Sequence, residues 1–209
     1  MKGNGTENVK FDEKVGKLKV SVIGSPALGS SRVIEPRARV MLFDAKGKEI
    51  TPGDPLNAFG GVGREWQVHA VPVGTYRAVI LAHGLQAFEI KEVKVKKGET
   101  TTITANPTAA AMLQVTIKNF RMQDLQTAQP AWELEDEAGN KVPWSSPDGQ
   151  ACFVTNMHGN DMQLVVINIP PEAKKARLVA KGYEDHVVDV DGSAGKTNLA
   201  DVNLIPTED

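Results

Sequence analysis

The chain has 209 residues, and its 24 basic and 26 acidic side chains give a formal net charge of −2. This balance excludes nucleic acid and anionic membrane as default partners. A hydrophobic content of 41% excludes a chain that is disordered by composition. Cys152 is the only cysteine, which excludes an internal disulfide and a cysteine-rich metal site.

The start of the chain is polar. Residues 1–14 carry both signs of charge and are predicted to form a flexible tail. No apolar signal core follows Met1, and no run of about 18 apolar residues occurs, so no membrane insertion is predicted. Two localisations stay open. One is extracellular, periplasmic or cell-surface, with a signal sequence that lies outside this sequence, and the other is cytoplasmic.

Apolar residues alternate with polar ones along most of the chain, for example at residues 18–22, 40–42 and 76–82. This period of two predicts strands with one buried face. A turn at residues 44–48 places Gly47 where a hairpin needs a positive φ. The buried parity changes between Ile90 and Val93, which predicts a β-bulge near Lys91 and Glu92. Trp66 and Trp132 alternate within strands and are predicted to lie in the core or on a sheet face.

The second half of the chain repeats the order of the first, with matched positions roughly 95 residues apart. Residues 113–117 match 18–22, residues 132–140 match 40–48, and residues 195–197 match 98–100. The pattern predicts an all-β protein of two tandem antiparallel immunoglobulin-like β-sandwich domains. The expected boundaries are a tail at 1–14, a first sandwich at 15–106, a linker at 107–111 and a second, divergent sandwich at 112–209.

Four short motifs carry a family resemblance. They are G-x-L-x-V-x-V at residues 16–22, A-x-V-x-L-x-D-x-x-G at 38–47, V-P-x-G-x-Y ending in Gly at 71–84, and V-x-V-x-x-G-x-T-x-x-I at 93–103. Together they resemble the carboxypeptidase regulatory-like domain, which implies a prealbumin-like (transthyretin-like) sandwich. The second unit departs from the family at Pro170-Pro171-Glu172, and Lys175 or Ala176 stands where the family has tyrosine.

Members of that family are mostly non-catalytic modules attached to peptidases, glycan-degrading enzymes and surface proteins. The resemblance therefore implies a binding, spacer or assembly role, most often outside the cytoplasm. It says little about the ligand, because the shared motifs consist of turn and core residues.

The sequence contains no complete catalytic or cofactor motif, which predicts a protein that is not an enzyme and has no cofactor. Residues 192–197 look like the end of a phosphate loop, but position 190 is valine and the context is a hairpin, so a turn is expected. No metal site is predicted beyond a weak calcium candidate at Asp189 and Asp191, because the local oxygen ligands are too few.

Two loops are the best candidates for contact with a partner. Residues 51–64 form a long glycine-rich loop with Phe59 and Arg64, which either takes part in recognition or is a plain insertion. Trp144, in the loop at 143–149, either stacks on a sugar or protein surface or caps its own sandwich. His158 lies at a predicted hairpin tip.

The leading hypothesis is a non-catalytic extracellular or cell-surface module for adhesion, assembly or spacing. It would bind protein or glycan at its loops or sheet edges, and its exposed strand edges are candidates for self-association. The first alternative is a carbohydrate-binding accessory module that uses the loop aromatics. The second is a small hydrolase or metalloenzyme on a transthyretin-like sandwich.

Overall fold

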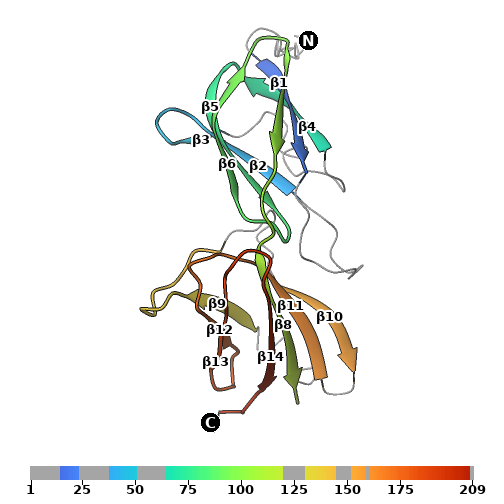
Figure 1. Cartoon of the computed structure of the whole chain (residues 1–209), viewed down its shortest axis with the longest axis vertical. Coiled ribbons are helices and arrows are strands. Elements are labelled where there is room, and N and C mark those ends of the chain that lie inside the picture. The colour runs from blue at the N-terminus through green and yellow to red at the C-terminus, as the bar shows by residue number, and fades with distance from the viewer. Residues whose placement is uncertain are drawn as a thin grey trace, which may run out of the picture.

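The computed structural model describes residues 15–23, 38–50, 65–119, 130–144, 152–158 and 161–207. Over these ranges the chain forms only strands, bridges and turns, which confirms the all-β prediction (Figure 1). In the same ranges there is no helix with the length and apolar character needed to cross a membrane.

Residues 15–105, called the N-terminal half, form two facing sheets. The first has the strand order β4-β1-β7 and the second has the order β3-β2-β5-β6. The strands are β1 (Val15–Val22), β2 (Ala38–Phe43), β3 (Glu49–Ile50), β4 (Glu65–Pro72), β5 (Gly74–Ala82), β6 (Phe88–Val95) and β7 (Thr100–Ala105).

Residues 111–207, called the C-terminal half, also form two sheets. Their strand orders are β10-β11-β8-β14 and β13-β12-β9. The strands are β8 (Ala111–Lys118), β9 (Ala131–Glu135), β10 (Cys152–His158), β11 (Asp161–Ile169), β12 (Lys175–Val179), β13 (His186–Asp189) and β14 (Thr197–Asn203). Figure 1 shows the two halves one above the other along the long axis of the molecule.

Each half encloses its own hydrophobic core. Leu18, Val20 and Val22 of β1 are buried in the first core, and Leu113, Val115 and Ile117 of β8 are buried in the second. These are the residues that alternation assigns to the inner face. Trp66 is 9% exposed and Trp132 is 8% exposed, so both predicted core tryptophans are buried.

The first and last strands of each half pair in parallel. Strand β1 pairs with β7 in this way, and β8 pairs with β14. The remaining strand pairs are antiparallel, as predicted. Because the first and last strands of a half run in the same direction, the chain enters each sandwich at one end and leaves it at the other.

Matched positions in the two halves have the same local structure. Gly47 and Gly139 both have positive φ, 77° and 83°, in the hairpins that follow β2 and β9. In each hairpin an aspartate carboxylate, that of Asp44 or Asp136, accepts backbone N–H bonds from the turn. These short polar side chains favour the turn because they hold its backbone donors.

Bulges lie at corresponding places in the sheets. The predicted bulge at Lys91 and Glu92 is confirmed, because the β5–β6 register shifts between the pairs Tyr76–Val93 and Ala78–Ile90. Further shifts occur in the β1–β4 pair and in the β8–β11 pair. In these two bulges a residue other than glycine has a left-handed backbone: Ala70 at φ 55° and Asn168 at φ 59°.

Candidate functional site

Trp144, the loop tryptophan singled out by the sequence, is half-buried at the edge of the C-terminal core. Its indole Nε1–H donates a hydrogen bond to the carbonyl oxygen of Ile167 on β11, at 2.9 Å. The ring is therefore held in one orientation by the core on one side and by this bond. Only the remaining part of the ring is accessible to a partner.

The other predicted contact residues are not brought together with Trp144 by the part of the chain that the structure describes. Phe59 and Arg64 lie outside the described residues. The backbone of His158 pairs with Asp161 at the end of the β10–β11 hairpin. These residues remain predictions.

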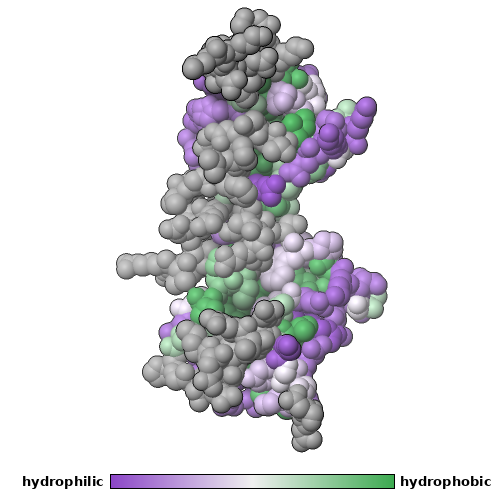
Figure 2. All heavy atoms as spheres, turned by 180° about the vertical axis from the view of Figure 1, so that it is seen from behind, coloured by the Kyte–Doolittle hydropathy of each residue, from purple (hydrophilic) through white to green (hydrophobic). Residues whose placement is uncertain are grey.

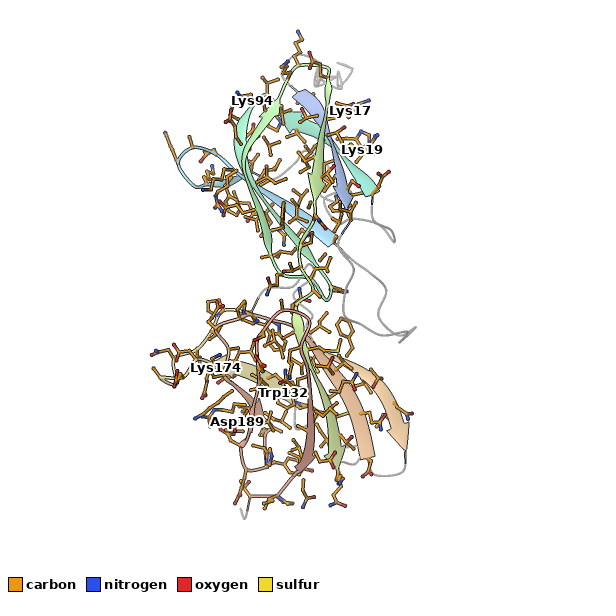
Figure 3. All side chains as sticks on the ribbon, in the orientation of Figure 1. Lys17, Lys19, Lys94, Trp132, Lys174 and Asp189 are labelled. Carbon is orange, nitrogen blue, oxygen red and sulfur yellow. The ribbon has the colours of Figure 1, made fainter. Side chains whose placement is uncertain are left out.

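Asp189 and Asp191, the weak calcium candidates, hold different positions. Asp189 is exposed on β13 and pairs with Lys175 of β12. Figure 3 shows Asp189 and Lys174 on the same side of the C-terminal half. The carboxylate of Asp191 accepts the backbone N–H of Ser193 at 3.0 Å, and hydrogen bonds from the side chain and then the backbone of Ser193 lower the pKa of Asp191. Across the described ranges, no three His, Cys, Asp or Glu side chains gather as metal ligands would.

The segment that looks like a phosphate loop is a turn between β13 and β14, as the sequence predicts. Gly192 is buried, and a Cβ atom placed on it would lie 2.2 Å from the carbonyl oxygen of Pro170. Glycine is required there by close approach of another backbone segment. This segment leads into a strand, so it has no helix N-terminus with which to hold a phosphate.

Cys152 has limited chemical reactivity. Burial raises the pKa of its thiol to about 11, so the nucleophilic thiolate is scarce at neutral pH. The thiol packs against the C-terminal core. This environment is that of a structural cysteine rather than a catalytic one.

Exposed apolar side chains and strand edges are the sites that a protein partner could contact. The described residues with large exposed apolar side chains are Ile23, Val73, Val154, Val187, Leu199 and Ile205. Leu199 is 76% exposed and lies on the edge strand β14. Seen from behind, hydrophobic atoms of the C-terminal half reach the surface among hydrophilic ones (Figure 2).

Strands β13 and β14 are edge strands of the two facing sheets, and a side chain partly closes the gap between them. Asn198 of β14 accepts the N–H of Asp191 at 2.8 Å and donates to the carbonyl oxygens of Asp191 and Met112 at 3.1 and 3.0 Å. These bonds link the turn after β13, at the end of one sheet, to β14 and β8 of the other sheet. In the N-terminal half, Thr101 of β7 donates to the carbonyl oxygen of Lys94 on β6 at 2.8 Å. Both halves thus close the corresponding edge with a side-chain bond.

A set of contacts that the sequence did not predict links the two halves. Asn168 of β11 bonds through its side chain to the turn at residues 82–85, which follows β5. His83 of the same turn lies edge-on to Phe153 of β10, with ring centroids 5.3 Å apart. We call residues 82–86, Phe153 and Asn168 the joint. An asparagine within the apolar run LVVINI was the only sequence signal for it.

Comparisons with known proteins give no family assignment. No protein-family model matches the chain, and no curated protein matches it. Among solved structures, the TIE protein of Bacillus anthracis aligns over 93% of this chain at 14% identity and a TM-score of 0.33. The chain spans 34% of the length of that protein.

Two pilins also align with the chain. The minor pilin GBS52 of Streptococcus agalactiae covers 93% of this chain and 98% of its own at 14% identity and a TM-score of 0.32. The shaft pilin SpaA of Lactobacillus rhamnosus GG covers 94% of this chain and 98% of its own at 12% identity and a TM-score of 0.29.

Proposed function

We propose that this chain is a non-catalytic spacer or scaffolding module of the cell surface or extracellular space. We further propose that its halves are two divergent copies of a carboxypeptidase regulatory-like domain, with boundaries at residues 15–106 and 112–209. The observation that carries the proposal is the parallel pairing of the first and last strands in each half. That pairing places the entry and exit of each sandwich at opposite ends, as a spacer needs.

The chemistry of the described residues supports this role over catalysis. Cys152 is partly buried and weakly acidic, and within the described ranges Asp189 and Asp191 belong to no cluster of three metal-ligating side chains. Several exposed charges pair with opposite charges on neighbouring strands, as in the ion pairs Lys19–Glu65 and Arg77–Glu89. Mixed charges of this kind keep a surface soluble and discourage unwanted strand pairing.

The test of the proposal combines shape, location and activity. Small-angle X-ray scattering of the purified chain should give the extended profile of two sandwiches end to end. Fractionation of the source cells should find the chain in the surface or secreted fraction. A compact profile, or a chain confined to the cytoplasm, would contradict the proposal. Turnover of an ester or peptide substrate that His158→Ala abolishes would favour the hydrolase alternative instead.

A second candidate function is glycan binding at Trp144. The observation that favours it is a fixed, half-exposed indole in a loop, since a ring held in one orientation loses little entropy when a sugar stacks on it. Glycan-array binding that Trp144→Ala abolishes and Trp144→Phe retains would support it. If no glycan on the array binds, the glycan-binding function is contradicted and only the spacer role remains as a proposal.

A further inference from the structure

We propose that Asn168 is a positioning residue that locks the two halves into one rigid body. The lock needs the turn of an N-terminal half docked on the β11 face of a C-terminal half, and it does not form with the halves in the reverse order. This lock is a property of the fold and does not depend on which ligand the chain binds. It rests on the hydrogen bonds of Asn168, on its backbone conformation, and on the different residues at the corresponding place in the N-terminal half.

The side-chain amide of Asn168 is fully used across the joint. Its Oδ1 atom accepts the backbone N–H of Gly84 at 2.7 Å. Its Nδ2 atom donates to the carbonyl oxygen of Ala82 at 2.8 Å and to that of Leu85 at 3.2 Å. Asn168 is 8% exposed, so these bonds are shielded from water. Breaking them would leave polar groups unpaired in a buried place, which is costlier than losing a surface bond.

The backbone of Asn168 is suited to this task. The residue lies in the bulge of β11 with φ 59°, and asparagine tolerates the left-handed region better than other non-glycine residues. A bulge redirects the side chain relative to a regular strand. Ile167 and Ile169 on either side are fully buried, so packing fixes the position from which the amide reaches the turn.

Apolar contacts surround the amide. His83 of the turn is 3% exposed and packs edge-on against Phe153. Phe153 in turn packs against a small cluster formed by Met112, Val165 and Ile167, which is separate from the main core of the C-terminal half. The linker is held as well, because the N–H of Ala110 donates to the carbonyl oxygen of Gly84 and that of Gln86 to the oxygen of Thr108, both at 2.9 Å. The halves therefore meet through a packed contact as well as a covalent link.

In the part of the N-terminal half that the structure describes, the corresponding face lacks these features. Ala70 occupies the left-handed bulge position that Asn168 occupies in β11. Exposed polar residues replace the small cluster: His69 for Ile167, Gln67 for Val165 and Lys17 for Met112. Among the described residues of this face neither the amide nor the apolar cluster is present, so they give a second copy of the chain no surface for the same joint.

The test uses the full chain and measures how the halves are oriented. In the native protein, backbone residual dipolar couplings from both halves should fit a single alignment tensor. Asn168→Asp keeps the size of the side chain and the acceptor for Gly84, but places an oxygen against the carbonyl groups of Ala82 and Leu85. This variant should require two tensors. Because the repulsion opens the joint to solvent, the amide of Gly84 should also exchange about tenfold faster or more, as expected for an amide that loses its burial.

Two further variants keep the test decisive. Asn168→Ala removes the bonds without adding charge, and it should give the same two tensors while couplings within each half still fit the native structure. Ala70→Asn puts an asparagine in the matching bulge where no turn is docked, and it should retain one tensor. Native halves that need two tensors would overturn the proposal. So would a single tensor in both Asn168 variants, whatever the exchange rate of Gly84.

Discussion

The phenolic hydroxyl of Tyr76 donates a hydrogen bond to the carbonyl oxygen of Pro72, four residues earlier, at 2.8 Å. Gly74 lies between them, and a Cβ atom placed on it would come within 2.8 Å of the Tyr76 hydroxyl oxygen. The motif V-P-x-G-x-Y is therefore a structural unit in which glycine makes room for the ring. A tyrosine that bonds back to nearby backbone is a recurring corner in immunoglobulin-like sandwiches.

The first prediction concerns this corner. Tyr76→Phe keeps the ring but removes the donor, and it should lower the free energy of unfolding by about 1 kcal/mol, as for a typical hydrogen bond. Urea unfolding followed by circular dichroism gives the value. Gly74→Ala should cost more because the new methyl group meets the hydroxyl. An unchanged stability in both variants would show that the corner contributes nothing.

The second prediction concerns the ion pair between Glu135 and Arg177. The Arg177 Nε–H donates to the Glu135 carboxylate at 2.7 Å, and this bond lowers the pKa of Glu135. A carboxyl group with a lowered folded-state pKa stabilises the fold above its unfolded pKa, and this contribution disappears as the pH falls through the folded value.

The stability difference between the native protein and Glu135→Gln should therefore be largest near neutral pH and shrink with acidification. Urea unfolding from about pH 7 down to about pH 2.5 measures it. Glu137→Gln is the matched control, because it makes the same change of charge at an exposed turn position next to β9. Equal pH profiles for the two variants would contradict the prediction.

The third prediction concerns the tight contact at Gly192. Gly192→Ala forces a methyl group against the backbone of Pro170 and should destabilise the C-terminal half by about 1–3 kcal/mol, the usual cost of overpacking. Gly98→Ala is a useful comparison, because Gly98 has φ 67° but open space around it. Its cost should be only the strain of a left-handed alanine, about 1 kcal/mol. Equal melting temperatures for Gly192→Ala and Gly98→Ala would refute the predicted difference between steric overlap and backbone strain.

The fourth prediction concerns the indole of Trp132, which lies inside the C-terminal half (Figure 3). Its Nε1–H has no hydrogen-bond partner among the described residues, and a buried unpaired donor costs about 1–3 kcal/mol. Trp132→Phe removes that donor while keeping an aromatic ring. It should therefore cost less than about 2 kcal/mol, against about 3–5 kcal/mol for Trp132→Ala.

Trp144→Phe is the matched control for this prediction, because the Trp144 donor is bonded to Ile167. The same substitution there loses a hydrogen bond and should cost about 1 kcal/mol from that source alone. Unfolding followed by circular dichroism avoids the loss of tryptophan fluorescence. A larger loss of unfolding free energy in Trp132→Phe than in Trp132→Ala would contradict the prediction.

Local sequence features predicted much of the fold. Alternation placed Leu18 and Leu113 inside, turn residues marked the hairpins, and the change of parity located the bulge at Lys91 and Glu92. Each of these depends on residues a few positions apart. Side-chain periodicity identifies a buried face but does not give the direction of the neighbouring strand, so the parallel pairing of β1 with β7 was not predicted.

The joint and the environment of Trp144 depend on contacts between residues distant in sequence. Asn168 meets a turn more than 80 positions earlier, and nothing local to that turn specifies its partner. The sequence left two interpretations of Trp144 open because the carbonyl group that binds its indole belongs to Ile167, on another strand. A polar residue inside an apolar run is therefore a candidate for a contact with a distant part of the chain.

The parallel pairing of terminal strands also determines how each half responds to tension. Pulling on both ends of a half drives β1 and β7, or β8 and β14, past each other along their length. The hydrogen bonds of such a ladder lie across the direction of pull and are strained together, whereas a hairpin pulled from its open end loses them one by one. Each half should therefore withstand stretching as a mechanical clamp, and the chain contains two such clamps in series.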